Sequence, residues 1–389
     1  MIPLLGESHE PLRREAARRL AHVKDVARLR PILAWLDACW RDHVFVASIV
    51  AWGGVGKTSL ITKWLARMRD DGWRGAERIY DWSFYRQGTN TAGSSDTFFA
   101  DALAKFGDPD PTKGSPWDKG ERLAKLVRDK RTLLVLDGVE PMQYGPGPQE
   151  GQFKDPALQT LAKELASNNN GVLLITSRLQ LADLNGLSGT KVQTKALEHL
   201  SAEAGAALLR GRGAKGNDDE LRIVSDEYKG HALALTLLGS YLDEVADGDI
   251  RRRNEIGPLH HDERNGGHAR RVMMSYESLL GKTELAILRM LGLFDRPATA
   301  EEIGALRVDP PVQGLTDSLV GVGGRDWNRA LTKLRRIGLV AADAGNVIDA
   351  HPLVRQHFGE QLKNENVDAF REGHRRLYEF LRTSTKEFP

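Results

Sequence analysis

Residues 44–61 read V-F-V-A-S-I-V-A-W-G-G-V-G-K-T-S-L-I, and this stretch decides the fold. Its first half, 44–52, is a continuous apolar run rich in Val and Ile, which is typical of a buried parallel strand. A glycine-rich turn follows, and apolar residues then recur at helical spacing from Lys57 to Arg69. A strand, a glycine-rich turn and a helix in direct succession predict a loop whose backbone N–H groups surround a phosphate.

The turn itself, A-W-G-G-V-G-K-T (51–58), fits the Walker A pattern G-x-x-x-x-G-K-[ST], except that Ala51 replaces the first glycine. Lys57 is expected to place its charge on the β- and γ-phosphates, and the Thr58 hydroxyl to ligate Mg²⁺. The alternative, a glycine turn followed by a chance Lys-Thr pair, is disfavoured by the strand and helix on either side. The predicted nucleotide-binding residues of the loop are Gly53, Gly54, Val55, Gly56, Lys57, Thr58 and Ser59.

A second apolar run, T-L-L-V-L-D-G (132–138), ends in an acid. At the carboxyl end of a buried strand, Asp137 would reach a Mg²⁺ ion beside the loop, as in the Walker B motif. The next position, where many fast ATPases have a second acid, is Gly138, and the nearest acid is Glu140. Asp137 is therefore predicted as a metal ligand and catalytic residue. Glu140 is either the base that polarises the attacking water or a capping or solvated residue.

A third apolar run, G-V-L-L-I-T-S (171–177), is followed directly by Arg178. An arginine that leaves the sheet on the phosphate side can contact the γ-phosphate. A surface arginine in a loop would be the usual interpretation of such a residue. The neighbouring motifs favour the catalytic role for Arg178.

The alternation of strands and helices predicts an α/β fold, a P-loop parallel sheet with helices on both faces. Further strands are expected at 77–85 and 191–194, and further helices at 96–106, 117–128 and 156–166. A helix over 8–40 should break or kink at Pro31. These patterns predict an N-terminal helical or linker segment (1–40) and a nucleotide-binding domain (41–195).

After Leu197 the strands stop, and a helical domain is expected at 196–250. Its three helices, at 201–211, 218–228 and 231–246, should be opened by Ser, Asn or Asp, and Gly. A charged, turn-rich linker (251–270) follows. Its histidines, His260, His261 and His268, lack metal-ligand spacing and are expected to be solvated, as are Arg252 and Arg253.

The last part of the chain has the helix, helix, helix, hairpin order of a winged helix, expected at 271–363. The helix 326–339 meets a hairpin, V-A-A-D-A-G-N-V-I-D-A-H (340–351), turned at 344–346. Residues 364–389 should form an amphipathic helix, the possible start of a repeat region. That helix lacks a convincing stop signal, so the natural chain is expected to continue.

Composition describes an ordinary soluble globular protein. The 55 basic and 53 acidic residues leave a net charge of +2, which gives no case for a membrane surface and makes nucleic acid an unlikely partner. Cys39 is the only cysteine, and a chain without an intrachain disulfide fits a reducing compartment. No apolar run reaches the length of a membrane helix, and the N-terminus does not read as a secretory signal. A cytoplasmic location is expected.

Taken in order, the motifs resemble those of NB-ARC modules, which belong to the STAND class of NLR-like signal-transduction ATPases. The motifs are GGVGKT (53–58), LLVLDG (133–138), ITSR (175–178), LEHLSAEA (197–204), GHALAL (230–235) and DAHPLV (349–354). The longer strings DWSFYRQGT (81–89), LDGVEP (136–141) and TSRLQLADL (176–184) are similar to the bacterial branch. The resemblance covers roughly residues 40 to 360.

The resemblance implies a nucleotide bound between the domains, with ADP holding the module closed and ATP permitting assembly. Arg178 corresponds to the sensor arginine for the γ-phosphate. Ala232 stands where the family has a proline that packs on the base and sugar. His351 corresponds to the histidine of the M-H-D motif, which contacts the β-phosphate of ADP. Self-association through the module is implied, and effector and sensor domains are expected outside this segment.

Three functions follow from these observations. The favoured one is an ADP-closed, ATP-open oligomerisation switch of a signalling or defence protein, which binds ATP or ADP with Mg²⁺ and hydrolyses ATP slowly. Innate immunity and antiviral defence are implied by the family alone. The alternative is an ATP-dependent transcription regulator, because helix 326–338 carries Arg329, Lys333, Arg335 and Arg336. A rapid housekeeping ATPase is disfavoured by Gly138 after Asp137.

Overall fold

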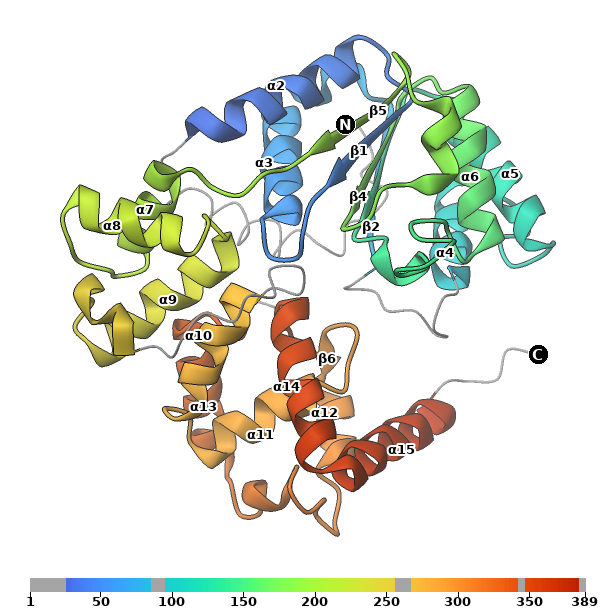
Figure 1. Ribbon diagram of the computed structural model, residues 1–389. Helices are drawn as coiled ribbons and strands as arrows, with labels where there is room; N and C mark the ends of the chain where they lie inside the picture. Colours follow the sequence, from blue (N-terminus) through green and yellow to red (C-terminus); the bar gives the residue numbers. More distant parts are fainter. Residues whose placement is uncertain (1–25, 85–94, 256–266, 342–346, 385–389) are drawn as a thin grey trace. The chain divides into compact units, whose positions relative to one another are not determined.

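The computed structural model describes residues 26–84, 95–255, 267–341 and 347–384 (Figure 1). The chain divides into two compact units, Met1–Glu198 and His199–Pro389. The first unit contains a parallel sheet, and the second is almost entirely helical. The predicted histidines at 260 and 261 and the predicted turn at 344–346 lie outside the described residues.

The sheet of the first unit has five strands in the order β2-β3-β4-β1-β5, all parallel. Each strand predicted from the sequence is present, and its ends lie within two residues of the predicted ends. This confirms the predicted parallel α/β sheet. The strands are β1 (Val46–Val50), β2 (Arg78–Ser83), β3 (Thr132–Asp137), β4 (Val172–Ser177) and β5 (Val192–Ala196).

Helices cover both faces of the sheet (Figure 1). Successive side chains of a strand point to opposite faces, so Leu133 and Val135 pack with α2 and α3, whereas Leu134 and Leu136 pack with the other layer. Burial on both faces explains why these strands are apolar throughout rather than alternating. The helices are α2 (Val26–Arg41), α3 (Lys57–Asp70), α4 (Asp96–Phe106), α5 (Pro116–Arg128) and α6 (Pro156–Ser167).

The predicted break at Pro31 is absent, because α2 continues past this proline to Arg41. The following turns are fixed by burial of Leu33, Leu36 and Trp40, and each fully buried Leu side chain contributes about 1.5–3 kcal/mol.

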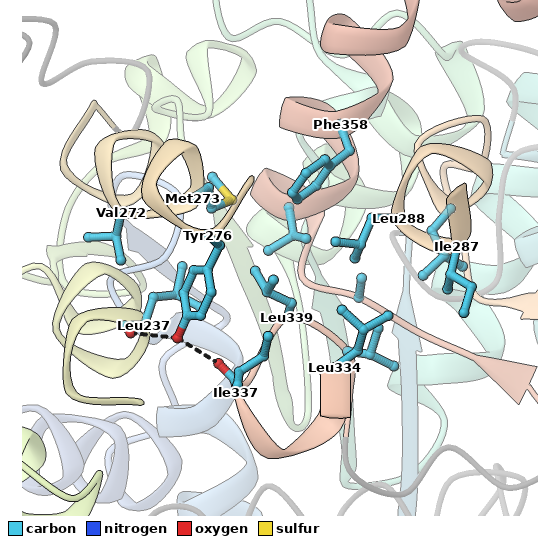
Figure 2. Packing of buried hydrophobic residues seen from close by; sticks show 14 of the residues in the cluster. Leu237, Val272, Met273, Tyr276, Ile287, Leu288, Leu334, Ile337, Leu339 and Phe358 are labelled. Carbon is cyan, nitrogen blue, oxygen red and sulfur yellow. Dashed lines mark hydrogen bonds between the residues drawn. The ribbon is translucent and has the colours of Figure 1, made fainter. Parts of the chain in front are cut away.

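The second unit has one continuous hydrophobic core that extends from α7 to α15. Figure 2 shows how Tyr276 joins its parts: the buried hydroxyl lies 2.9 Å from the carbonyl oxygen of Leu237 and 3.4 Å from that of Ile337. Burial raises the pKa of this phenol well above its ordinary value, so it stays a hydrogen-bond donor. The helices are α7 (Ala202–Gly211), α8 (Asp218–Glu227), α9 (Ala232–Val245), α10 (Gly267–Glu277), α11 (Lys282–Leu291), α12 (Ala300–Leu306), α13 (Gly324–Arg336), α14 (Pro352–Glu365) and α15 (Val367–Ser384).

Two residues of the predicted linker, Arg253 and His268, are not solvated as expected. Residues Ile250–Glu255 form a 3-10 helix whose Ile250 is fully buried, and Arg253 is paired with Glu227 of α8 at 2.8 Å instead of solvated. His268, expected in solvent, is buried at the start of α10, where its ring lies 5.9 Å from that of Tyr228. Neither ring nitrogen has a hydrogen-bond partner among the described residues, and burial lowers the pKa of this imidazole.

The third helix of this unit, α9, is opened by His231 instead of the predicted glycine. The Nδ1 atom of His231 accepts the N–H of Ala234 at 3.2 Å, which satisfies one of the free donors of the first turn. Gly230 has a different role. Its φ is +63°, and a side chain there would collide with the carbonyl oxygen of Leu200.

The hairpin predicted at 340–351 also differs. Its second strand, β7 (Val347–Ile348), forms an antiparallel ladder with β6 (Ala298–Thr299), which precedes α12. The earlier half contributes one described hydrogen bond, from the N–H of Ala341 to the carbonyl oxygen of Asp349 at 2.7 Å. A pairing between segments 48 or more residues apart has no local signal, whereas a hairpin turn does.

No helix in the described part of the chain is long and apolar enough to cross a membrane.

Candidate functional site

The glycine-rich loop joins β1 to α3 and has the backbone that the motif predicts. Gly54 and Gly56 have φ values of +79° and +108°, which side-chain-bearing residues rarely adopt. Gly56 is the N-cap of α3, and no side chain caps that helix. The N–H groups of the first turn are therefore available to an anion, and the helix dipole favours negative charge there.

Lys57 begins α3 and folds back over the loop. Its Nζ atom donates to the carbonyl oxygens of Ala51 at 2.5 Å and Trp52 at 3.2 Å, and lies 3.6 Å from Oε1 of Glu140. The side chain is only 9 % exposed, and burial lowers the pKa of the ammonium below its ordinary value, while the charge of Glu140 opposes that shift. Lys57 is thus a buried cation held by polar atoms alone.

Asp137 ends β3, and Thr58 lies in the first turn of α3, which follows β1. The two residues lie side by side, although β4 separates β3 from β1 in the sheet. The Thr58 hydroxyl donates to Oδ2 of Asp137 at 2.9 Å. A magnesium ion takes oxygen ligands and usually keeps several waters and phosphate oxygens. One hydroxyl and one carboxylate at this distance fit such an ion, and Thr58 and Asp137 would hold it.

Thr176, the second-to-last residue of β4, completes this network and was not predicted from the sequence. Its hydroxyl donates to Oδ1 of Asp137 at 2.7 Å and accepts the N–H of Gly138 at 2.8 Å. Each oxygen of the Asp137 carboxylate therefore accepts a hydrogen bond from a threonine hydroxyl. The available signal was the polar pair Thr176–Ser177 at the end of an otherwise apolar strand.

Gly138 turns the chain back over the loop after β3. Its φ is +71°, which favours glycine, and the N–H of Val139 then donates to the carbonyl oxygen of Thr176 at 3.0 Å. A short 3-10 helix, Glu140–Met142, follows. The glycine that stands in place of a second acid is thus what brings Glu140 to the site.

Arg178 lies against the loop. A Cβ atom added to Gly53 would be 3.2 Å from Cζ of Arg178, so the guanidinium lies close against the loop at this glycine. Nε of Arg178 is 3.8 Å from Oε1 of Glu140, the same oxygen that faces Lys57. The first unit therefore brings together the loop residues 53–59, Asp137, Glu140 and Arg178.

The remaining predicted site residues, Ala232 and His351, belong to the second unit. Ala232 is the half-buried first residue of α9. His351 is the N-cap of α14, and its Nδ1 accepts the N–H of Leu353 at 3.1 Å. In a neutral ring that accepts through Nδ1, the proton is on Nε2. Local capping is thus observed for His351, and its predicted contact with a phosphate stays a prediction.

The chain matches no family model. A curated relative, an uncharacterized WD repeat-containing protein of Nostoc sp., is 22 % identical over 351 residues, which are 85 % of this chain and 26 % of the relative. Among solved structures, a signal transduction ATPase with numerous domains (STAND) from Pyrococcus horikoshii, which has a tetratricopeptide repeat sensor, has a TM-score of 0.59 at 19 % identity. That match covers 92 % of this chain and 45 % of the other.

The chain therefore has a fold similar to that of this STAND protein. The chain spans about a quarter of the Nostoc relative and under half of the Pyrococcus protein. The comparisons do not support the expectation that nucleic acid is an unlikely partner. The ORC1 protein of Aeropyrum pernix, solved in complex with DNA, matches at 17 % identity over 90 % of this chain and 98 % of that one. With a TM-score of 0.38, this match does not support DNA binding by the present chain either.

Proposed function

We propose that this chain is the nucleotide-controlled switch module of a larger signalling protein. It would bind ATP or ADP with Mg²⁺, hydrolyse ATP slowly, and self-associate when ATP replaces ADP. The observation that carries the proposal is the convergence of Lys57, the Thr58–Asp137 pair and Arg178 on one glycine-rich loop. These groups supply charge for phosphates, oxygen ligands for the metal and an arginine at the terminal phosphate.

Slow turnover is supported by the position of Glu140, the candidate base identified among the described residues of the site. The residue after Asp137 is glycine, and the carboxylate of Glu140 faces the cations Lys57 and Arg178. A carboxylate held in this way must leave at least one cation before it can accept a proton from water. A protein that acts by changing state does not need rapid hydrolysis.

A switch also needs a contact that differs between ADP and ATP, since a ligand shifts an equilibrium only through its differential affinity for the two states. We propose His351 for that contact, on the resemblance of 349–354 to the family motif. Its Nε2–H, set by the cap at Nδ1, is a donor suited to the β-phosphate.

We expect His351→Ala to weaken ADP binding by about ten- to a hundredfold, because a charge-assisted hydrogen bond contributes about 1.5–3 kcal/mol. ATP affinity should change less, and self-association, followed by sedimentation velocity, should increase. His351→Ser is the matched control, since serine restores the helix cap but not the imidazole. If the serine variant binds ADP as tightly as the unsubstituted protein, His351 is only a cap.

A second candidate function, nucleic-acid binding, is favoured by one observation in the second unit. A hollow of about 500 Å³ lies along α13, lined by Arg325, Asn328, Arg329, Thr332, Lys333 and Arg336. Three of its four cations have an acidic neighbour: Asp326 for Arg329, Glu284 for Lys333 and Glu244 for Arg336. Such pairs at a surface contribute about 0–1 kcal/mol, so phosphates can compete for the cations.

If this surface binds duplex DNA, replacing both Arg325 and Arg329 by Gln should weaken binding in a gel shift and lower the salt slope by about 1 per lost phosphate contact. Arg382→Gln, at the exposed end of α15, is the control. The same affinity and the same slope in all three proteins at low and high salt would exclude α13 as a DNA surface.

A further inference from the structure

One oxygen of Glu140 faces both cations of the loop. Oε1 is 3.6 Å from Nζ of Lys57 and 3.8 Å from Nε of Arg178. The Glu140 side chain is only 10 % exposed, and its second oxygen, Oε2, is buried with no hydrogen-bond partner among the described residues. A buried carboxylate oxygen without a partner is unusual, because its desolvation is not offset by a hydrogen bond.

Oxygen atoms surround the ammonium group of Lys57 in this arrangement. An ammonium group has three N–H donors. Two are directed at the carbonyl oxygens of Ala51 and Trp52, and the third side of the group faces Glu140. A phosphate oxygen can approach Lys57 only if one of these oxygens leaves, and a carboxylate on a side chain can move more easily than a loop carbonyl.

The backbone keeps Glu140 close to the loop. Gly138 reverses the chain with its positive φ, the N–H groups of Gly138 and Val139 are both bound to Thr176, and Val139 and Met142 are buried. Only the side chain of Glu140 is therefore free to change its position. The carboxylate is anionic, oxygen-bearing and within reach of the two cations on which a terminal phosphate depends.

We propose that the Glu140 carboxylate competes with the terminal phosphate of the nucleotide for Lys57 and Arg178. Glu140 thereby lowers nucleotide affinity, and ATP entry releases the carboxylate from both cations. The proposal rests on the proposed nucleotide-binding function and adds a regulatory role within the same site. Glu140 should lower the affinity for ATP more than the affinity for ADP, because the γ-phosphate is the group expected at both cations.

The test is nucleotide binding by Glu140→Gln, an isosteric and neutral variant. Titration calorimetry with ATP and Mg²⁺ should show about tenfold tighter binding, equivalent to about 1.4 kcal/mol, and a smaller gain for ADP. The melting temperature without nucleotide should fall slightly, and its rise with ATP should be larger. Glu140→Asp keeps the charge on a shorter side chain. Its ATP affinity should lie between those of the unsubstituted protein and Glu140→Gln. Glu121→Gln, on the exposed side of α5, is the matched control and should bind as the unsubstituted protein does.

Three outcomes are distinguishable. Tighter ATP binding by Glu140→Gln, but not by Glu121→Gln, supports competition. Unchanged or weaker ATP binding by a folded Glu140→Gln, while Lys57→Ala abolishes binding, overturns competition and leaves the nucleotide-binding function intact. If the unsubstituted protein binds neither ATP nor ADP, the proposed function fails, and the competition fails with it.

Discussion

Lys57→Ala is expected to weaken both ATP and ADP binding by at least about a hundredfold, because several charge-assisted hydrogen bonds of about 1.5–3 kcal/mol each are lost. The fold should survive. Among the described residues, Nζ of Lys57 contacts polar atoms: two carbonyl oxygens of the same loop and one oxygen of Glu140. Titration calorimetry measures the affinities, and circular dichroism with thermal melting checks the fold.

Lys125→Ala is the matched control for this substitution. Lys125 is an exposed lysine on α5, in the same unit but in the layer that does not contain the loop. Its loss changes the net charge by the same amount and should leave both affinities unchanged. Equal ATP and ADP affinities in the Lys57→Ala variant and the unsubstituted protein would show that the loop 51–58 does not bind phosphate.

Asp137→Asn is expected to lower ATP turnover by at least about a hundredfold, as seen when a single electrostatic contact to a transition state is removed. Asparagine has nearly the same shape. Its carbonyl oxygen can accept from one threonine hydroxyl and its NH2 group can donate to the other, so the network in the sheet should persist. It lacks the negative charge that a hard divalent cation requires. The stimulation of ATP binding by Mg²⁺ should therefore disappear together with turnover.

The metal role can be separated from a structural role by combining the substitution with chelation. If Asp137 holds the ion, removing Mg²⁺ should lower the ATP turnover of the Asp137→Asn variant only slightly further, because both changes act on one interaction. Fully additive losses of turnover would show that the metal is bound elsewhere. Asp129→Asn, at the exposed end of α5, controls for the loss of one carboxylate.

The parts of this molecule that were predictable are those with local signals. Strands buried on both faces give continuous apolar runs, so β1, β3 and β4 were visible, as were the loop and Asp137 at their carboxyl ends. Helix starts such as Ser115 and Asp155 carry side chains that cap the first turn, and the helices α5 and α6 begin beside them as expected.

What could not be predicted depends on distant contacts. Thr176 reads as an ordinary strand residue until β3 and β4 are paired and its hydroxyl reaches Asp137. Gly138 reads as a missing acid, although its positive φ is what returns Glu140 to Lys57. In the sequence, His268 is surrounded by charged residues, so it is interpreted as part of a polar linker and its burial is not predicted. In each case the partner lies in another segment, so no window of sequence contains the information.

The tyrosine that joins α9, α10 and the end of α13 ties together segments that are far apart in the sequence. Because Tyr276 and one continuous core connect these helices, residues 199–389 form a single compact body. A force applied at α15 would therefore be carried through this body as far as α7 instead of being dissipated between its helices.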